Sequence, residues 1–201
     1  MKKKLKHLNK DKNILYTGFG DVGTTTLFDC KQGRISKSAI LIEALGSVDE
    51  LNAYLGIIKV YSDIYKMSLN ISKKKVAFSK IIEDIQQTLF VIQAELGGSK
   101  MSVSKKDLNN IEKIINTIGD ELPPIKSFTI SGGSVLSSGL DFARTLVRRS
   151  ERRIIAVSDE GSRKIGQVTL SYINRLSSAL FAMSRYTNHV LSIPESHPDY
   201  K

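Results

Sequence analysis

A glycine-rich segment near the start of the chain, residues 16–26, carries residue types that can bind phosphate. It reads Tyr-Thr-Gly-Phe-Gly-Asp-Val-Gly-Thr-Thr-Thr and so contains the G-x-G-x-x-G spacing of dinucleotide-binding loops. Such a loop needs a strand before its glycines and a helix opening on the last one, whereas three threonines in a row start a helix poorly. A P-loop is excluded because no Gly-Lys-Ser/Thr closes the motif. The segment is therefore either an anion cradle of backbone N–H groups and hydroxyls or an ordinary turn-rich arm.

Five arginines lie close together in a region with the apolar spacing of a helix. Arg144, Arg148 and Arg152 follow one another at four-residue steps and share one stripe, and Arg149 and Arg153 form a second stripe. Like charges at this spacing destabilise a helix, so we expect an anionic partner. The rigid fork of arginine suits phosphate or carboxylate. The region is therefore either a phosphate site or a basic face that is solvated or paired with acids on a neighbouring helix.

Other polar residues within apolar helical patterns could meet these arginines. Glu151 is the only acid between them. Asp49 and Glu50 lie beside apolar positions of the first helical pattern, and Asn174 precedes Arg175 in the last one. Because buried polar groups need partners, we expect these residues either to satisfy one another or to surround a ligand.

Hydrophobic residues at three- and four-residue steps predict five helices to position these groups. The predicted ranges are 39–61, 72–96, 104–118, 134–157 and 166–191. No convincing strand is present, so the predicted fold is an all-α, five-helix bundle of ferritin-like up-down helices with an irregular N-terminal segment.

Capping and breaking residues set the ends of these helices. Ser47 and Glu50 could form a capping box that opens the first helix late, but one long helix through Gly46 is preferred. Pro123-Pro124 ends the third helix, and Ser134 is predicted to cap the fourth. Residues 125–131 are predicted to form an extended crossing loop between them.

The chain has 201 residues, of which 41% are hydrophobic and 25% charged, and a net charge of +10. This size favours one domain over 1–201, with an N-terminal arm over 1–38 and the bundle over 39–193. No apolar run reaches the length of a membrane span, and no signal-peptide core follows the basic first residues. Together with a single cysteine, Cys30, this predicts a cytoplasmic protein. The charge predicts an anionic partner, with the lysines of the tail (Lys2 to Lys12) and the run Lys73–Lys75 interpreted as solvated surface.

Taken together, these motifs resemble the PduO-type ATP:cob(I)alamin adenosyltransferases. Six matches follow one another in the family's order along nearly the whole chain, and the order is more specific than any single motif. They are Tyr16-Thr17 with Gly20-Asp21, Gly23, Thr25 and Leu27; Arg34 to Lys37; Glu43 to Asn52; Leu122-Pro123-Pro124 with Ser127-Phe128 and Gly132-Gly133; Ala143 to Arg153; and Tyr172 to Ser177. The chain departs from the family at Gly18, Phe19 and Leu41, where basic residues or threonine are common.

The resemblance implies a trimer with active sites between subunits, in which ATP lies against the N-terminal segment of one subunit and the arginine helix of its neighbour. Arg148 would hold the phosphates and Lys37 would neutralise them. Glu151 and Asn174 would position ATP and its Mg²⁺. The resemblance implies no direct protein ligand for this Mg²⁺, which would be held through the ATP phosphates, with Glu151 as the possible exception. The full implied ATP-binding set is Thr17, Gly18, Gly20, Asp21, Gly23, Thr24, Thr25, Lys37, Arg148, Glu151, Arg152 and Asn174.

The implied catalytic set is Arg148, Phe128, Asp49 and Arg144, with Arg144 pairing across the interface with Asp49. Phe128 matches the aromatic residue that covers the lower face of the corrin and keeps the cobalt without its lower ligand. Cob(I)alamin is itself a strong nucleophile, so the protein mainly has to position it against the 5′-carbon of ATP and stabilise the leaving triphosphate. The implied partners are ATP, a corrinoid, two further copies of the chain and a flavin- or flavodoxin-type cobalamin reductase, with neither nucleic acid nor a membrane.

Two other functions remain open from the residues. A basic helical nucleic-acid binder would use the lysine-rich tail and the arginine helix, although no helix-turn-helix or aromatic stacking set is present. A catalytically degenerate ATP-binding helical oligomer would account for the missing basic residues at Gly18 and Leu41.

Overall fold

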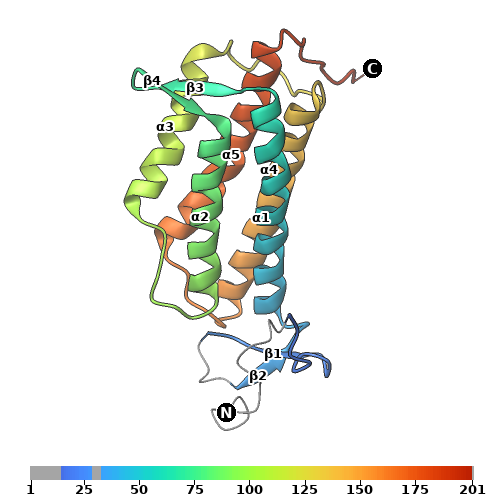
Figure 1. Cartoon of the computed structure of the whole chain (residues 1–201), viewed down its shortest axis with the longest axis vertical. Coiled ribbons are helices and arrows are strands. Elements are labelled where there is room, and N and C mark those ends of the chain that lie inside the picture. The colour runs from blue at the N-terminus through green and yellow to red at the C-terminus, as the bar shows by residue number, and fades with distance from the viewer. Residues whose placement is uncertain (1–14, 29–32, 201) are drawn as a thin grey trace.

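The computed structural model describes residues 15–28 and 33–200, and five helices form the bulk of this part (Figure 1). They are α1 (Ile40–Ile64), α2 (Phe78–Leu96), α3 (Lys105–Glu121), α4 (Val135–Asp159) and α5 (Gln167–Val190). Figure 1 shows them side by side, each running opposite to the one before it in the chain. α4 packs against both α1 and α5, while α2 packs against α1 and α3 against α5. The predicted all-α bundle of up-down helices is confirmed.

The core lies where the apolar stripes of the helices meet. Side chains spaced by three and four residues are almost completely buried there, among them Leu51, Leu55, Ile58, Phe78, Ile82, Leu89, Ile92, Leu136, Leu140, Ile173, Leu176 and Leu180. Burying one such side chain contributes about 1.5–3 kcal/mol. Hydrophobic spacing therefore determines which face of each helix turns inward, and so which face presents the charged residues.

The structure agrees with the predicted helix ends where a capping or helix-breaking residue defines them. Ser134 caps α4 through its side chain, as predicted. α1 runs unbroken through Gly46, and Ser47 donates to the Ala44 carbonyl at 2.8 Å instead of opening the helix. Residues 122–134 contain neither helix nor strand, in agreement with the predicted crossing loop.

Two short antiparallel hairpins correct the expectation that the chain has no strands. β1 (Thr24–Thr26) pairs with β2 (Arg34–Ser36), and β3 (Ser68–Ile71) pairs with β4 (Lys74–Ala77). The second hairpin also corrects the predicted start of the second helix at residue 72, because the helix begins only at Phe78.

The tight turn between β3 and β4 explains this difference. Ser72 and Lys73 have φ values of 50° and 65°, which is the two-residue hairpin turn whose twist matches the flanking strands. Lys73–Lys75 therefore lie at the hairpin tip and not at a helix start. Their side chains are exposed, as predicted for solvated lysines.

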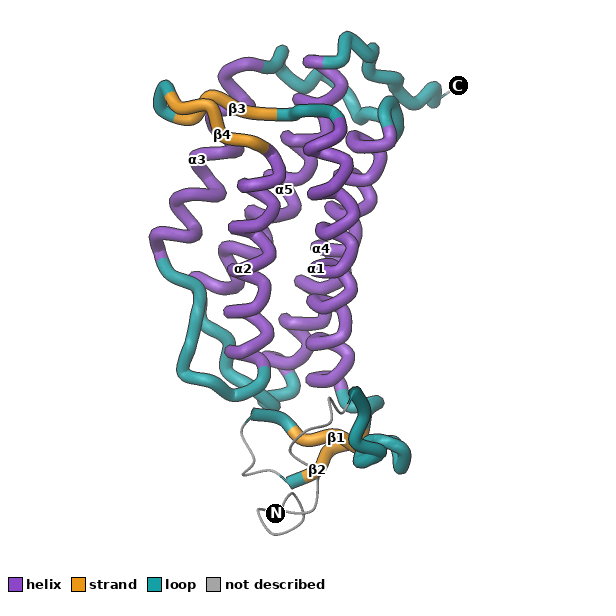
Figure 2. Tube along the Cα trace, in the orientation of Figure 1, coloured by secondary structure: helices purple, strands orange, loops and turns teal. Residues whose placement is uncertain are grey.

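The two hairpins lie at opposite ends of the bundle (Figure 2). β1 and β2 adjoin the start of α1, whereas β3 and β4 cross the other end. Within residues 15–28 and 33–200, no helix is long and apolar enough to cross a membrane. The predicted lysine-rich tail and Cys30 lie outside the described residues.

Glu95, at the end of α2, holds the first turn of α5. Glu95 is 7% exposed, and its carboxylate accepts hydrogen bonds from the Gly166 amide at 2.8 Å and the Thr169 hydroxyl at 2.6 Å. This distant cap matters because Gly166, at the N-cap of α5, has no side chain to do the same.

We expect Glu95→Ala to lower the free energy of unfolding by about 2 kcal/mol, because a buried amide and hydroxyl lose a charged acceptor. Glu95→Gln keeps an acceptor oxygen and should lose less. Urea unfolding followed by circular dichroism measures both changes. Equal stability of the three proteins would contradict the capping role.

Candidate functional site

The glycine-rich segment folds into two consecutive turns that lead into β1. The Asp21 amide donates to the Gly18 carbonyl at 3.2 Å, and the Gly23 amide donates to the Gly20 carbonyl at 3.1 Å. Gly18 and Gly23 have φ values of 68° and 73°, a conformation that favours glycine. A strand follows these glycines, so the segment lacks the strand–glycine–helix order of a dinucleotide-binding loop. We refer to residues 17–25 as the cradle.

Lys37, directly after β2, returns to the cradle. Its amide donates to the Gly23 carbonyl at 2.9 Å. Its ammonium group lies so close to Gly20 that a Cβ at this position would stand 2.9 Å from Nζ. Glycine at position 20 thus leaves room for a cation against the backbone. The cradle and Lys37 therefore bring threonine hydroxyls and an ammonium group together, which suits an anion such as a phosphate.

Arg34 shapes the cradle, a role that sequence reasoning missed. Its Nε donates to Thr24 Oγ1 at 2.8 Å, and its Nη2 donates to the Thr24 carbonyl at 2.7 Å and to the Phe19 carbonyl. These Arg34 donors therefore bind acceptors within the cradle, including the Thr24 hydroxyl oxygen. The sequence offered one indication of this role: Arg34 belongs to the matched motif Arg34 to Lys37, three residues before Lys37.

One arginine stripe of α4 is paired with acids of α1. Arg149 pairs with Glu50, and Arg153 Nη2 lies 3.1 Å from Glu43 Oε2. The expectation that Glu50 meets an arginine is confirmed. For this stripe, ion pairing to a neighbouring helix is the correct interpretation.

The other stripe is largely open. Arg144 Nε lies 3.1 Å from Asp141 Oδ1, and its guanidinium stands 6.0 Å from the centre of the Phe181 ring. Arg148 and Arg152 are exposed, and their side chains form no ion pair or hydrogen bond with any residue that the structure describes. These two guanidinium groups of α4 are therefore available to an outside anion.

Polar side chains connect α4 to α5 and α3 beside the open arginines. Asn174 Nδ2 donates to Glu151 Oε1 at 2.9 Å, and Asn174 Oδ1 accepts from Arg175 Nη1 at 2.9 Å. Arg175 Nε continues to Glu112 Oε1 at 3.2 Å. Glu151 and Asn174 are thus brought together, as predicted, and the network orients the Glu151 carboxylate next in sequence to Arg152.

Asp49 and Arg144 do not meet within one chain. Asp49 Oδ1 accepts a weak hydrogen bond from Gln93 Nε2 at 3.4 Å, and Arg144 pairs with Asp141 on its own helix. Their implied pairing would have to form between two chains.

Phe128 lies at the other end of the bundle from the cradle. It belongs to the loop between α3 and α4, at the upper end in Figure 1, and its side chain is 79% exposed. The cradle adjoins the start of α1 at the lower end. Because α4 has 25 residues, about 37 Å of helix runs between these ends, with Arg148 near its middle. A single chain therefore keeps the three parts of the predicted site apart.

Curated proteins and solved structures similar to this chain share one description. The chain is 36% identical over 182 residues to corrinoid adenosyltransferase PduO of Citrobacter freundii, covering 87% of this chain and 50% of that protein. It thus spans about half the length of this relative. A corrinoid adenosyltransferase of the same organism is 35% identical over 198 residues, covering 92% of this chain and 97% of that protein.

Two solved structures of PduO-type adenosyltransferase variants from Lactobacillus reuteri have the same fold. One is complexed with cobalamin and ATP, and matches with a TM-score of 0.80 and 28% identity over 93% of this chain and 97% of that chain. The other is complexed with ATP, and matches with a TM-score of 0.78 and 30% identity over 92% of this chain and 100% of that chain. The profile of the cobalamin adenosyltransferases matches residues 15–187. This chain therefore belongs to the cobalamin adenosyltransferase family.

Proposed function

We propose that this chain transfers the 5′-deoxyadenosyl group of ATP to the cobalt of cob(I)alamin, forming adenosylcobalamin and releasing triphosphate. The observation that carries the proposal is the contrast between the arginines of α4. Arg149 and Arg153 are neutralised by α1, whereas Arg148 and Arg152 point their charge outward with no described partner. In a family whose solved members bind ATP, these two cations are suited to a polyphosphate.

The spacing of two residues supports the same assignment. Of the two Lactobacillus reuteri structures, the one with ATP is a variant at an arginine, and the one with cobalamin and ATP is a variant at a phenylalanine. These two residues are twenty positions apart in that protein. Phe128 and Arg148 have the same spacing here. We assign Phe128 to the corrinoid and Arg148 to the phosphates.

The active site would form between subunits of a homotrimer. An assembly is needed because the cradle, Arg148 and Phe128 are too far apart in one chain. An exposed apolar surface supports it: Ile57, Val60 and Ile64 of α1 are more than half exposed, and Phe142 of α4 packs edge-on against Tyr54 with ring centres 5.0 Å apart. Apolar surface of this kind marks a contact with another protein.

In this arrangement the protein accelerates the reaction by positioning and by charge. Cob(I)alamin supplies the nucleophile, which attacks the 5′-carbon while the bond to the triphosphate breaks. Arg148, Arg152 and Lys37 stabilise the negative charge that develops on the leaving group. Phe128 keeps water and a lower ligand away from the cobalt.

Mg²⁺ fits this site through oxygen donors. It is usually held by one or two carboxylates together with substrate phosphates. Glu151 offers a carboxylate beside Arg152, oriented through one oxygen by Asn174. Bound there, Mg²⁺ would add positive charge at the triphosphate. A flavin- or flavodoxin-type reductase remains the proposed source of cob(I)alamin.

The proposal is tested by mixing the protein with ATP and chemically reduced cobalamin without oxygen and following adenosylcobalamin by its visible absorption. We expect product only when both substrates are present. A degenerate oligomer would bind ATP without forming product, and a nucleic-acid binder would do neither.

Lys37→Ala should raise KM for ATP about tenfold, the effect of losing about one charged hydrogen bond. KM for the corrinoid should stay unchanged, because Lys37 is assigned to the phosphates of ATP and not to the corrinoid. Initial rates at varied ATP measure this effect, and Lys113→Ala, an exposed lysine on α3, is the matched control. Equal KM values for ATP in both variants would remove Lys37 from the site.

A further inference from the structure

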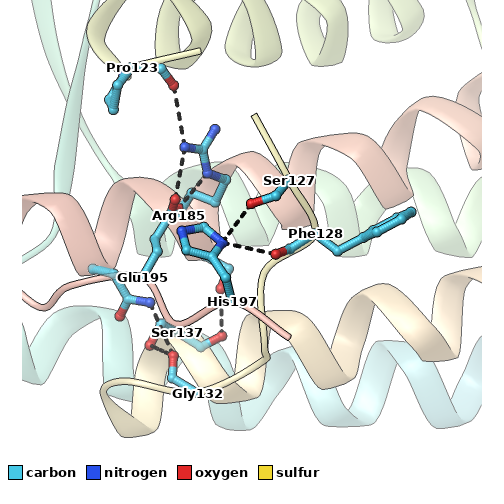
Figure 3. Close-up of polar contacts among 10 residues, drawn as sticks. Pro123, Ser127, Phe128, Gly132, Ser137, Arg185, Glu195 and His197 are labelled. Carbon is cyan, nitrogen blue, oxygen red and sulfur yellow. Dashed lines mark hydrogen bonds and ion pairs between the residues drawn. The ribbon is translucent and has the colours of Figure 1, made fainter. Parts of the chain in front are cut away.

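The last residues that the structure describes, 191–200, turn back over the loop that carries Phe128. Figure 3 shows this C-terminal segment beside the loop, with His197 between them and the Phe128 ring pointing away from the contact. The Ile130 amide donates to the Ser196 carbonyl at 2.8 Å. The segment therefore forms a backbone contact with the loop, in addition to its side-chain contacts.

α5 fixes both ends of the loop. At its start, Arg185 Nη2 donates to the Pro123 carbonyl at 3.3 Å. At its end, Asn188 Nδ2 donates to the Gly132 carbonyl at 3.0 Å. The next residue, Gly133, has φ of 109°, and a Cβ there would overlap the Asn188 amide. The loop is thus held at its two ends by a rigid helix.

His197 holds the middle of the loop, at Phe128 itself. Its Nδ1 lies 2.9 Å from the Phe128 carbonyl and 2.9 Å from Ser127 Oγ (Figure 3). Because a carbonyl oxygen only accepts, Nδ1 must carry a proton for this bond. The Phe128 side chain is 79% exposed, so packing against its own subunit does little to place it. Its direction depends on the backbone, which His197 holds.

His197 is in turn held by the segment that bears it. Two residues earlier, Glu195 accepts from Arg185 Nε at 2.5 Å and from Nη2 at 3.1 Å. The Arg185 side chain is 9% exposed and the Glu195 side chain 27% exposed, so this pair is largely buried. A continuous series of contacts therefore runs from α5 through Glu195 and His197 to Phe128.

We propose that His197 is a positioning residue for the corrinoid: it fixes the Phe128 backbone so that the ring meets the lower face of the corrin in one place. This inference rests on the proposed adenosyl transfer. It adds a role for the C-terminal segment, which lies beyond the matched range 15–187.

The test compares three variants of the full-length protein with the wild type. His197→Ala removes the donor, His197→Asn restores an N–H at about the place of Nδ1, and His189→Ala removes an exposed histidine from the end of α5 as a control. We expect His197→Ala to lower kcat/KM for the corrinoid about 10- to 100-fold, the effect of a small misplacement of a reacting group. KM for ATP should not change. His197→Asn should recover most of the loss, and His189→Ala should behave as the wild type.

Hydrogen exchange of residues 127–131 gives a readout that does not depend on turnover. We expect faster exchange in His197→Ala than in His197→Asn or the wild type. Unchanged exchange together with unchanged corrinoid kinetics would overturn the positioning role. An equal fall in kcat/KM for the corrinoid in His197→Ala and His197→Asn would also overturn it. So would a change in KM for ATP in His197→Ala. A wild-type protein without any adenosyl transfer would instead refute the proposed function, whatever the exchange data show.

Discussion

Arg148→Ala is expected to lower kcat/KM for adenosyl transfer about 100- to 1,000-fold, as removal of a donor to a developing anion does elsewhere. Arg148 is exposed and has no described partner, so the folded chain does not depend on its charge. Helix content and thermal stability should therefore stay unchanged, while the triphosphate loses a bidentate hydrogen-bond donor.

Two variants of α4 sharpen this prediction. Arg148→Lys keeps the charge but not the fork, and should fall between the wild type and Arg148→Ala. Arg153→Ala removes an arginine of the same helix whose charge is paired with Glu43, and should retain activity. Equal activity of Arg148→Ala and Arg153→Ala would show that the open stripe does not bind the phosphates.

Phe128→Ala should lower kcat/KM for the corrinoid about 100-fold, because the corrin loses the aromatic surface that places it and shields the cobalt. The loss should leave KM for ATP unchanged, since Phe128 is assigned to the corrinoid and the phosphates are assigned to other residues. Because the Phe128 side chain is 79% exposed, its removal should cost little stability.

Steady-state rates at varied corrinoid and varied ATP separate the two effects. Phe90→Ala, which removes an exposed phenylalanine from α2, is the matched control. A parallel loss in both Phe128→Ala and Phe90→Ala, or a rise in KM for ATP in Phe128→Ala, would contradict the assignment of Phe128 to the corrinoid.

Hydrophobic periodicity was sufficient to predict the five helices, because each buries one continuous apolar stripe. The short hairpins were missed for the opposite reason. β3 and β4 have four residues each, too few for an alternating pattern to stand out, and the turn uses Ser72 and Lys73 instead of the Asn-Gly that would have signalled it.

The arginine spacing identified a charged helix but could not tell which stripe binds a ligand. Both stripes have the same four-residue step, and the difference lies in their neighbours. Glu43 and Glu50 stand seven residues apart on α1 and face Arg153 and Arg149 only because α1 and α4 pack antiparallel. Contacts between distant segments of this kind are set by the tertiary structure and leave no local signal.

The loop contacts of Phe128 were hidden for the same reason. His197 and Phe128 are 69 residues apart in the chain, and nothing in the sequence near either residue indicates that they meet. The role of Arg34 was easier to suspect, since Arg34 lies in a matched motif. Its Nη2 nevertheless donates to the carbonyl groups of Phe19 and Thr24, which come within hydrogen-bond distance only in the folded cradle.

The central claim, that Arg148 of one subunit and the cradle of another form one site, is tested most directly with mixed trimers. Arg148→Ala removes a positive charge at the triphosphate and Lys37→Glu reverses one, so we expect each variant alone to have less than about a tenth of wild-type activity. The two chains are unfolded, mixed in equal amounts, refolded and assayed for adenosylcobalamin. Random assembly of a cyclic trimer leaves both residues intact at about a quarter of the interfaces, so we predict about a quarter of wild-type activity. A mixture no more active than either variant alone would contradict a site shared between subunits.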